Sequence, residues 1–405
     1  MAYDVARIRS WFPSLEQGWA LFDGPGGTQA PRQVGEAIAT TLTGPLSNRG
    51  PLGESAQRAD AAVAAFRDAV ADFTGADPRG VVHGRSATQL VYDFSRHLSR
   101  SWSPGDEVVV TRLDHDSNVR PWVQAAERAG ATVRWVAFDP ATGELPVDTV
   151  ASALTERTRL VAVTAASNLI GTKPDVAAIA DAVHAAGALL CVDGVHHAAH
   201  ELPDLAALGA DFLTCSPYKF LGPHCGVLVA DPALLETIAP DKLLPSTDVV
   251  PERFEFGTLP YEMLAGVTAA IDVLASLDAD ADADAATPRR ARLAASYAAL
   301  HEHESRLLAR LESALADLPG TTVHSRAARR TPTLLATFAG HEASVVSEAL
   351  AADRVLAPSG NFYALEASRH LGLGDAGGLR IGLAPYTDDD DVDRLIDGLR
   401  RATAA

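Results

Sequence analysis

Six short runs of β-branched and other apolar residues lie between residues 81 and 230, and alanine-rich stretches with a helical pattern separate them. This alternation indicates βαβ units, and therefore a mostly parallel sheet with helices on both faces. Ligands of such sheets bind at the carboxyl ends of the strands, so the residues that directly follow each run are the candidate site residues. The runs are EVVVTRL, ATVRWVAF, RLVAVTAAS, ALLCVDGV, DFLTCSP and GVLVADP.

The chain is long enough for more than one hydrophobic core. Its 405 residues predict one large α/β domain with a smaller companion. Two later strand-like runs, TPTLLATFAG and GLRIGLAPY, are flanked by helical patterns and predict a small C-terminal α/β domain. The run DADADADAATP predicts a solvated linker or loop, because alternating Asp and Ala offers a metal ion no fixed geometry. We expect an N-terminal segment at 1–30 packed with the small domain, a large domain at 31–285 and the small domain at 286–405.

Composition and charge exclude several classes of protein. Hydrophobic residues make up 47% and charged residues 21%, which is typical of a soluble globular protein. The net charge of −18 argues against a nucleic-acid or anionic-membrane binder. No run is apolar enough to span a membrane, and the N-terminus lacks the apolar core of a signal peptide. The three cysteines form no CxxC pair, so neither a disulfide framework nor a thiolate zinc site is predicted. A cytoplasmic protein fits best.

The first candidate residues follow the early strands. In GRSATQLVYDF, Ser86, Ala87 and Thr88 open a helix, where free backbone N–H groups and hydroxyls favour an anion such as phosphate. Ser and Thr are also ordinary N-cap residues, so this stretch by itself allows both interpretations. His115 follows the next buried strand and could stack on a flat ligand, titrate, or hydrogen-bond the loop. Asn168 follows another strand, where its amide could donate to or accept from a ring hydroxyl.

Two charged residues lie at or just after the ends of the later strands. Asp193 closes ALLCVDGV, a fully apolar run, and a buried carboxylate is costly unless a cation or donor pairs with it. A protonated pyridine nitrogen would be such a partner. His196 and His197 follow, but adjacent histidines do not easily aim at one ion, so no metal site is predicted. Lys219 lies in a turn between two buried strands, where a lowered pKa would suit Schiff-base chemistry, although a lysine in a turn is usually solvated.

In this order, these features resemble the fold-type I pyridoxal-phosphate enzymes, and specifically the class V aminotransferase group that includes cysteine desulfurases and selenocysteine lyases. The resemblance runs from FDGPGGTQAP to LRIGLAPYTDDDDVDRL. It includes DHDSNVRPW, VDGVHH, SPYKFLGP, FEFGTLPYEMLAG and RIGLAPY in the family's order and approximate spacing. The resemblance implies pyridoxal 5′-phosphate as cofactor, an amino-acid substrate, and a homodimer with shared active sites.

The resemblance implies a role for each residue near the cofactor ring. Lys219 would hold the cofactor through a Schiff base and remove the substrate Cα proton. Asp193 would pair with the pyridine nitrogen and keep it protonated, so that the ring acts as an electron sink. His115 would stack on the ring face. Asn168 and His196 would approach the phenolic oxygen, with His196 in the place of a glutamine common in the desulfurases.

The resemblance also implies a phosphate site shared between subunits. Ser86, Ala87 and Ser216 would hold the phosphate within one chain. Gly257 and Thr258 match the segment that reaches the phosphate from the neighbouring subunit.

One loop departs from the desulfurase pattern. Desulfurases of this group carry a nucleophilic cysteine in a loop similar to SGHHCA, whereas residues 359–364 here read SGNFYA and place Tyr363 at that position. The three cysteines lie within or at the start of strand runs and are expected in the core.

The resemblance also implies substrate-binding residues. Arg380 would receive the substrate α-carboxylate with its planar fork, and Asn361 is a second candidate substrate-binding residue. The SGNFYA form resembles a branch called cysteine desulfurase-like.

The sequence therefore predicts a PLP-dependent lyase or transferase that acts on an amino acid or amino-acid-like substrate. The leading hypothesis is a C–S or other β-elimination, in which Tyr363 positions or protonates the leaving group. Transamination and epimerisation on the same scaffold are alternatives. A non-catalytic PLP-binding protein is a third possibility, against which the intact Lys219, Asp193 and Arg380 set argues.

Overall fold

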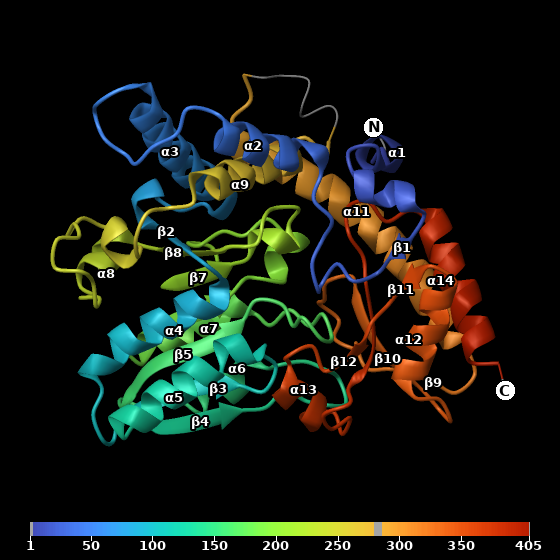
Figure 1. Cartoon of the computed structure of the whole chain (residues 1–405). Helices are drawn as coiled ribbons and strands as arrows, with labels where there is room; N and C mark the ends of the chain where they lie inside the picture. Colours follow the sequence, from blue (N-terminus) through green and yellow to red (C-terminus); the bar gives the residue numbers. More distant parts are fainter. Residues whose placement is uncertain (1–2, 279–285, 405) are drawn as a thin grey trace.

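The computed structural model describes residues 3–278 and 286–404. Within these ranges the largest sheet has seven strands in the order β2-β8-β7-β6-β5-β3-β4 (Figure 1). All neighbours are parallel except that β8 runs antiparallel to β2 and β7. The strands are β2 (Val81–Gly84), β3 (Glu107–Thr111), β4 (Thr132–Val136), β5 (Thr158–Thr164), β6 (Leu189–Asp193), β7 (Phe212–Cys215) and β8 (Gly226–Ala230).

The predicted α/β class with a mostly parallel sheet is confirmed, because β3 to β8 fall on the six apolar runs. Both faces of this sheet are covered by helices. Val109 of β3 lies in a core cluster with residues of α3, α7 and α9, whereas Val108 and Val110 lie in a second cluster with α4 and α5. Burial on both faces explains why these strands read as continuous apolar runs.

Helices α3, α7 and α9 contribute to the core on one face of the large sheet, and α2 packs along α9 (Figure 1). The helices of this region are α2 (Arg32–Thr43), α3 (Glu54–Thr74), α4 (Ala87–Leu98), α5 (Arg120–Ala129), α6 (Val147–Ala151), α7 (Val176–Ala185), α8 (Pro232–Glu236) and α9 (Tyr261–Leu274).

The C-terminal part forms a second, antiparallel sheet. Its order is β12-β13-β10-β9, and α12 and α14 share its core cluster with alternate residues of β10 and β13. The elements are α11 (Arg289–Ala316), β9 (Thr321–Val323), β10 (Thr333–Phe338), α12 (Ala343–Ala352), β11 (Val355–Leu356), β12 (Ser359–Gly360), α13 (Leu365–His370), β13 (Gly378–Gly382) and α14 (Asp389–Ala402). The two strand-like runs predicted here are β10 and β13.

The N-terminal segment lies against this second sheet. After α1 (Val5–Arg9), the strand β1 (Ala20–Leu21) pairs in parallel with β11, and the side chain of Phe22 lies in the core of the C-terminal part. The domain boundaries given above stay a prediction. Most of the Asp- and Ala-rich run predicted as a linker lies outside the described residues.

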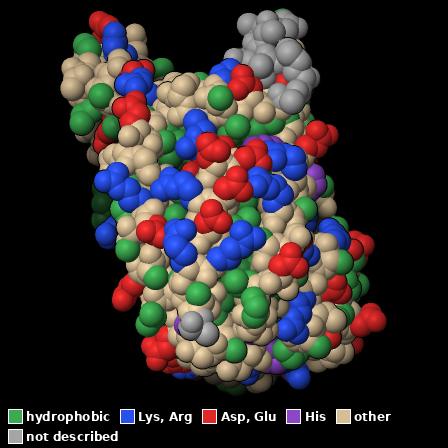
Figure 2. Space-filling model, turned by 90° about the vertical axis from the view of Figure 1, so that its right-hand side faces the viewer, with side chains coloured by type: hydrophobic (Ala, Val, Ile, Leu, Met, Phe, Trp, Pro, Cys, Tyr) green, Lys and Arg blue, Asp and Glu red, His purple; other side chains and the backbone are tan. Residues whose placement is uncertain are grey.

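Charges of both signs are interspersed on the face that carries α11 and α14 (Figure 2). Arg306 of α11 lies 2.7 Å from Asp389, and Arg310 lies 2.5 Å from Asp393, so both pairs join α11 to the acidic first turns of α14. Among the described residues, no helix is both long and apolar enough to cross a membrane.

Candidate active site

A cavity of about 480 Å³ lies at the carboxyl ends of the parallel strands. Loops that follow β3, β5, β6 and β7 line it, together with the N-terminal segment, the start of α4 and the SGNFYA loop. The site is therefore where the sheet topology places it. Of the predicted site residues, the cavity brings together Ala87, His115, Asn168, Asp193, His196, Ser216, Lys219, Tyr363 and Arg380.

The predicted phosphate loop is the N-terminus of α4. Ser86 is the N-cap, and its Oγ accepts a hydrogen bond from the backbone N–H of Gln89 at 3.1 Å. Ala87 and Thr88 line the cavity directly, whereas Ser86 does not. A Cβ at Gly226 of β8 would lie 2.2 Å from the Ser86 carbonyl carbon, so this glycine allows the strand to approach the loop closely. The Ser86 side chain accepts the N–H of Gln89, so the N–H groups that precede it in the first turn of α4 are available to an anion.

Lys219 ends a short 3₁₀ turn (Pro217–Lys219) after β7. Its Nζ donates to the backbone oxygens of Pro25 and Gly26, the latter at 2.9 Å. Burial, and next the positive charge of Arg380, lower the pKa of Lys219 to about 7. A large fraction of this amine is therefore neutral, and nucleophilic, near neutral pH.

Asp193 is the last residue of β6 and is 5% exposed. Its Oδ1 accepts a hydrogen bond from the backbone N–H of Val195 at 2.9 Å, which fixes the carboxyl group at the strand end. Burial raises the pKa of Asp193 to about 6, while that hydrogen bond and the Lys219 charge oppose the rise. A cation bound in the cavity would lower this pKa and stabilise the carboxylate.

His115 caps the 3₁₀ turn Asp116–Asn118 after β3. Its Nδ1 accepts a hydrogen bond from the backbone N–H of Ser117 at 3.0 Å, so a neutral ring carries its proton on Nε2. Burial, followed by the charges of Lys219 and Arg380, lowers the pKa of His115 to about 4. The imidazole is thus neutral, which suits a flat stacking surface.

Arg380 of β13 is 2% exposed and is held from three sides. Its Nη2 donates to Asp23 Oδ1 at 2.6 Å, its Nη1 donates to the backbone oxygen of Asn168 at 3.1 Å, and its guanidinium lies 3.7 Å from the centre of the Phe362 ring. Asp23 and Phe362 are site residues that the sequence analysis did not single out. Both lie in segments that carry the family resemblance, FDGPGGTQAP and SGNFYA, but the sequence of neither segment predicts a contact with Arg380.

The side chains of Asn168 and His196 are each fixed by hydrogen bonds along one edge. Asn168 Nδ2 donates to the backbone oxygen of Phe362 at 2.9 Å. His196 Nε2 lies 2.9 Å from Thr331 Oγ1 and 3.0 Å from Thr333 Oγ1. Both residues line the cavity, so each is fixed by one edge and can present the other to a ligand.

Three polar atoms on cavity-lining residues are buried and have no partner among the described residues. They are Asn168 Oδ1, His196 Nδ1 and Arg380 Nε. A buried polar atom without a partner is costly, so these atoms indicate a bound ligand with complementary groups. A ligand with a ring hydroxyl and an attached carboxylate would complement these three atoms, and pyridoxal phosphate carrying an amino acid offers both groups.

The SGNFYA loop is tied across the cavity. Besides the Asn168 bond to Phe362, the backbone N–H of Asp116 donates to the backbone oxygen of Tyr363 at 2.7 Å. Phe362 and Tyr363 have φ angles of 52° and 60°, a strained conformation for residues other than glycine. The side chain of Tyr363 is 74% exposed and its ring centre lies 5.6 Å from that of His115, so it stands at the mouth of the cavity.

Two groups of predicted site residues lie elsewhere. Asn361 does not line the cavity, because its Nδ2 donates to the backbone oxygen of Asp375 and its Oδ1 accepts from the backbone N–H of Tyr363. Thr258 lines a second cavity of about 410 Å³, and Gly257 faces open space. Within one chain, neither Gly257 nor Thr258 therefore contributes to the first cavity.

The cysteines lie in the core. Cys191, Cys215 and Cys225 are free and buried, and none of them lines the cavity. Burial raises the pKa of Cys225 to about 12. Within residues 3–278 and 286–404, no group of three or more His, Cys, Asp or Glu side chains is arranged to hold a metal ion.

Comparison with known proteins identifies the family. The model of the family described as aminotransferase class-V matches residues 20–395. The chain belongs to this family. It is 36% identical to the protein MT3887 of Mycobacterium tuberculosis, over 98% of this chain and 99% of that protein. It is 32% identical to the aminotransferase-like protein FGM3 of Gibberella zeae, over 98% and 97%.

A desulfurase of the same family is also similar in structure. The cysteine desulfurase CsdA of Escherichia coli is 31% identical over 99% of this chain and 98% of that protein. Its crystal structure superimposes with a TM-score of 0.87 over 99% of both chains. The predicted fold-type I architecture is thereby confirmed. Class V aminotransferases use pyridoxal 5′-phosphate, and this chain is a PLP-dependent enzyme.

Proposed function

We propose that this class V enzyme acts on an α-amino acid or amino-acid-like substrate and catalyses β-elimination, with a C–S bond as the preferred bond to break. The observation that carries the proposal is a single cavity that combines Lys219, Asp193 and Arg380 but contains no thiol. The similarity to CsdA, a cysteine desulfurase, supports a sulfur-containing amino acid as substrate.

Each of the main cavity residues has a separate role in the proposed reaction. Arg380, fixed by Asp23, binds the substrate α-carboxylate. Lys219 would hold the cofactor, and its neutral amine would remove the Cα proton of the substrate. When bound, pyridoxal phosphate supplies an electron sink for the charge left at Cα. Asp193 would stabilise a positive charge on the pyridine nitrogen, and the neutral His115 would offer its face to the ring.

Replacement of the loop thiol by Tyr363 favours elimination over sulfur transfer. A persulfide mechanism needs an exposed thiolate acceptor, and the three cysteines are buried. The Tyr363 hydroxyl stands at the cavity mouth and positions or protonates the departing group. The leaving thiol then departs into solvent rather than onto the protein.

Transamination is a second candidate, because the similar protein FGM3 is described as aminotransferase-like. Transamination would release a keto acid without ammonia. Elimination would instead release a keto acid, ammonia and the leaving group.

We also propose a cytoplasmic homodimer with shared active sites. Gly257 and Thr258 lie outside the cavity of their own chain, and Leu243, Leu244 and Phe256 of the same region are exposed apolar side chains. A second copy would cover these side chains and receive the segment. Three unpaired cysteines are consistent with a reducing compartment.

The test is a spectral titration of the holoenzyme with a panel of amino acids and S-substituted cysteines, with keto acid and ammonia measured in parallel. We expect an S-substituted cysteine to perturb the absorbance of the lysine-bound cofactor and to release keto acid and ammonia in equal amounts. Loss of the cofactor band without ammonia would favour transamination. A protein whose spectrum never changes on incubation with PLP would refute both.

A further inference from the structure

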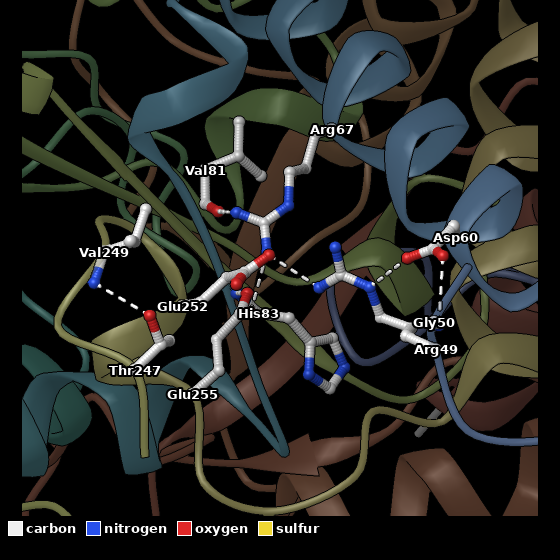
Figure 3. Close-up of polar contacts among 10 residues, drawn as sticks. All are labelled: Arg49, Gly50, Asp60, Arg67, Val81, His83, Thr247, Val249, Glu252 and Glu255. Carbon is white, nitrogen blue, oxygen red and sulfur yellow. Dashed lines mark hydrogen bonds and ion pairs between the residues drawn. The ribbon is translucent and has the colours of Figure 1, made fainter. Parts of the chain in front are cut away.

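The outer edge of β2 is covered by two side chains rather than by another strand. β2 is the edge strand of the large sheet, so the backbone groups of Val81 and His83 that face outward have no strand partner. Glu255 Oε1 accepts a hydrogen bond from the backbone N–H of His83 at 2.9 Å. Arg67 Nη1 donates to the backbone oxygen of Val81 at 3.4 Å (Figure 3). Arg67 and Glu255 thus take the place of a neighbouring strand.

Arg67 and Glu255 also form a buried ion pair. Arg67 Nη2 lies 2.8 Å from Glu255 Oε2, and the two side chains are 10% and 4% exposed. A buried pair is tolerated when further hydrogen bonds satisfy both groups, and here the backbone of β2 supplies one to each. Removal of either partner would leave an uncompensated charge against this strand.

The pair connects the two segments that are predicted to bind phosphate. Two residues after His83, the chain enters the loop that ends at Ser86 and the N-terminus of α4. Two residues after Glu255 lies Gly257, followed by Thr258. In addition, the Phe254 ring stacks on Phe94 of α4 with ring centres 5.1 Å apart. The segment 254–258 is therefore tied both to β2, which leads into α4, and to α4 itself.

A more exposed set of ion pairs continues outward from this one. Arg49 lies 2.5 Å from Glu252 and 2.6 Å from Asp60, and its side chain is 37% exposed (Figure 3). Glu252 also lies 3.7 Å from Arg67 Nη2, so the two sets share one carboxylate. Replacing Arg49 leaves the Arg67–Glu255 pair and its bonds to β2 in place, and exposed pairs contribute little to stability, so Arg49 provides a control for Arg67.

We propose that Arg67 and Glu255 are positioning residues for the phosphate group of the cofactor. By substituting for a strand along β2, they hold the N-terminus of α4 for the phosphate of their own chain and hold Gly257 and Thr258 for the phosphate of the partner. The inference rests on the proposed PLP chemistry and homodimer. In addition to that function, the affinity of the enzyme for the cofactor phosphate depends on an ion pair that does not line the cavity.

The test compares PLP with pyridoxal, which lacks the phosphate. Glu255→Gln keeps an acceptor for His83 but removes the charge that faces Arg67. We expect Glu255→Gln to weaken PLP binding about tenfold, as loss of a supporting contact typically does, and to leave pyridoxal binding unchanged. Inorganic phosphate should compete with PLP for the apoenzyme about tenfold less well in this variant. The affinities for PLP, pyridoxal and phosphate are all measured by absorbance titration of the apoenzyme, with dimer content checked by light scattering.

The outcomes separate positioning from general damage. Arg49→Gln should bind PLP, pyridoxal and phosphate as the wild type does. Equal losses for PLP and pyridoxal in Glu255→Gln, or no loss for either, would overturn the inference. If Glu255→Gln does not fold, the double variant Arg67→Met, Glu255→Gln removes both charges. It is judged by the same comparison, the loss of PLP affinity against the loss of pyridoxal affinity. Failure of the wild type to bind PLP would instead refute the proposed function.

Discussion

Arg380 Nη2 donates to Asp23 Oδ1 at 2.6 Å, although the two residues are 357 positions apart in the chain. Asp23 and the Asn168 backbone hold two edges of the guanidinium, and the Phe362 ring supports its face. The orientation of Arg380 is therefore set before a carboxylate arrives. Preorganisation of this kind lowers the entropic cost of substrate binding.

We predict that Asp23→Asn raises the KM for the amino-acid substrate about tenfold, because a charge-assisted hydrogen bond contributes ~1.5–3 kcal/mol. The cofactor should stay bound. Steady-state kinetics measure the effect, and Asp389→Asn, which removes an exposed partner of Arg306, is the control. A lower KM in Asp23→Asn would contradict this account, since it would mean that Asp23 competes with the substrate for Arg380.

Lys219 should react as an amine with a pKa near 7 in the apoenzyme. Burial lowers the pKa of Lys219 to about 7, so the ammonium predominates below that pH and the reactive amine above it. The rate of modification by trinitrobenzenesulfonate should therefore rise with pH and level off above about pH 8. Peptide mapping separates Lys219 from Lys173 and Lys242, the two other lysines of the chain. A half-maximal rate near pH 10 at Lys219 would show that the amine is not perturbed.

Tyr363→Phe tests the role assigned to the phenolic hydroxyl. If the hydroxyl protonates or positions the leaving group, kcat should fall at least about tenfold, with little change in cofactor binding. A series of substrates with progressively better leaving groups should show a decreasing defect. Unchanged turnover with the best substrate would remove Tyr363 from the mechanism.

Gly226→Ala should destabilise the protein. The added Cβ would lie 2.2 Å from the Ser86 carbonyl carbon, a backbone atom that cannot rotate away. We expect a loss of about 1–3 kcal/mol in the free energy of unfolding, as overpacking typically causes. Gly35→Ala in α2 is the matched control, because a Cβ there meets nothing within 4 Å, and it should be neutral or stabilising by up to ~1 kcal/mol. Equal stabilities in the two variants, measured by urea denaturation, would contradict the close approach of β8 to the phosphate loop.

The large sheet could be predicted from the sequence because burial on both faces leaves a continuous apolar run in each strand. The positions of Asp193 and Lys219 followed, since parallel strands place their carboxyl ends at one edge. Their separation of 26 residues did not obscure the shared site, because each was located by its own strand.

The contacts between distant segments could not be predicted in this way. Asp23 reaches Arg380 through the pairing of β1 with β11 and the return of β13, and no periodicity in the sequence encodes that approach. The Arg67 and Glu255 pair depends on which strand lies at the edge of the sheet. Asn361 was proposed from its loop, but its amide bonds to the backbone N–H of Tyr363 and to the backbone oxygen of Asp375 and does not line the cavity.

The central claim is that Lys219 drives elimination from an amino acid, and product stoichiometry with an S-substituted cysteine tests it most directly. The reaction consumes one water and releases the thiol, a keto acid and ammonia. We predict equal amounts of all three over many turnovers by the wild type, and none by Lys219→Ala reconstituted with PLP. Keto acid without ammonia, or release of all three by Lys219→Ala at the wild-type rate, would contradict the account.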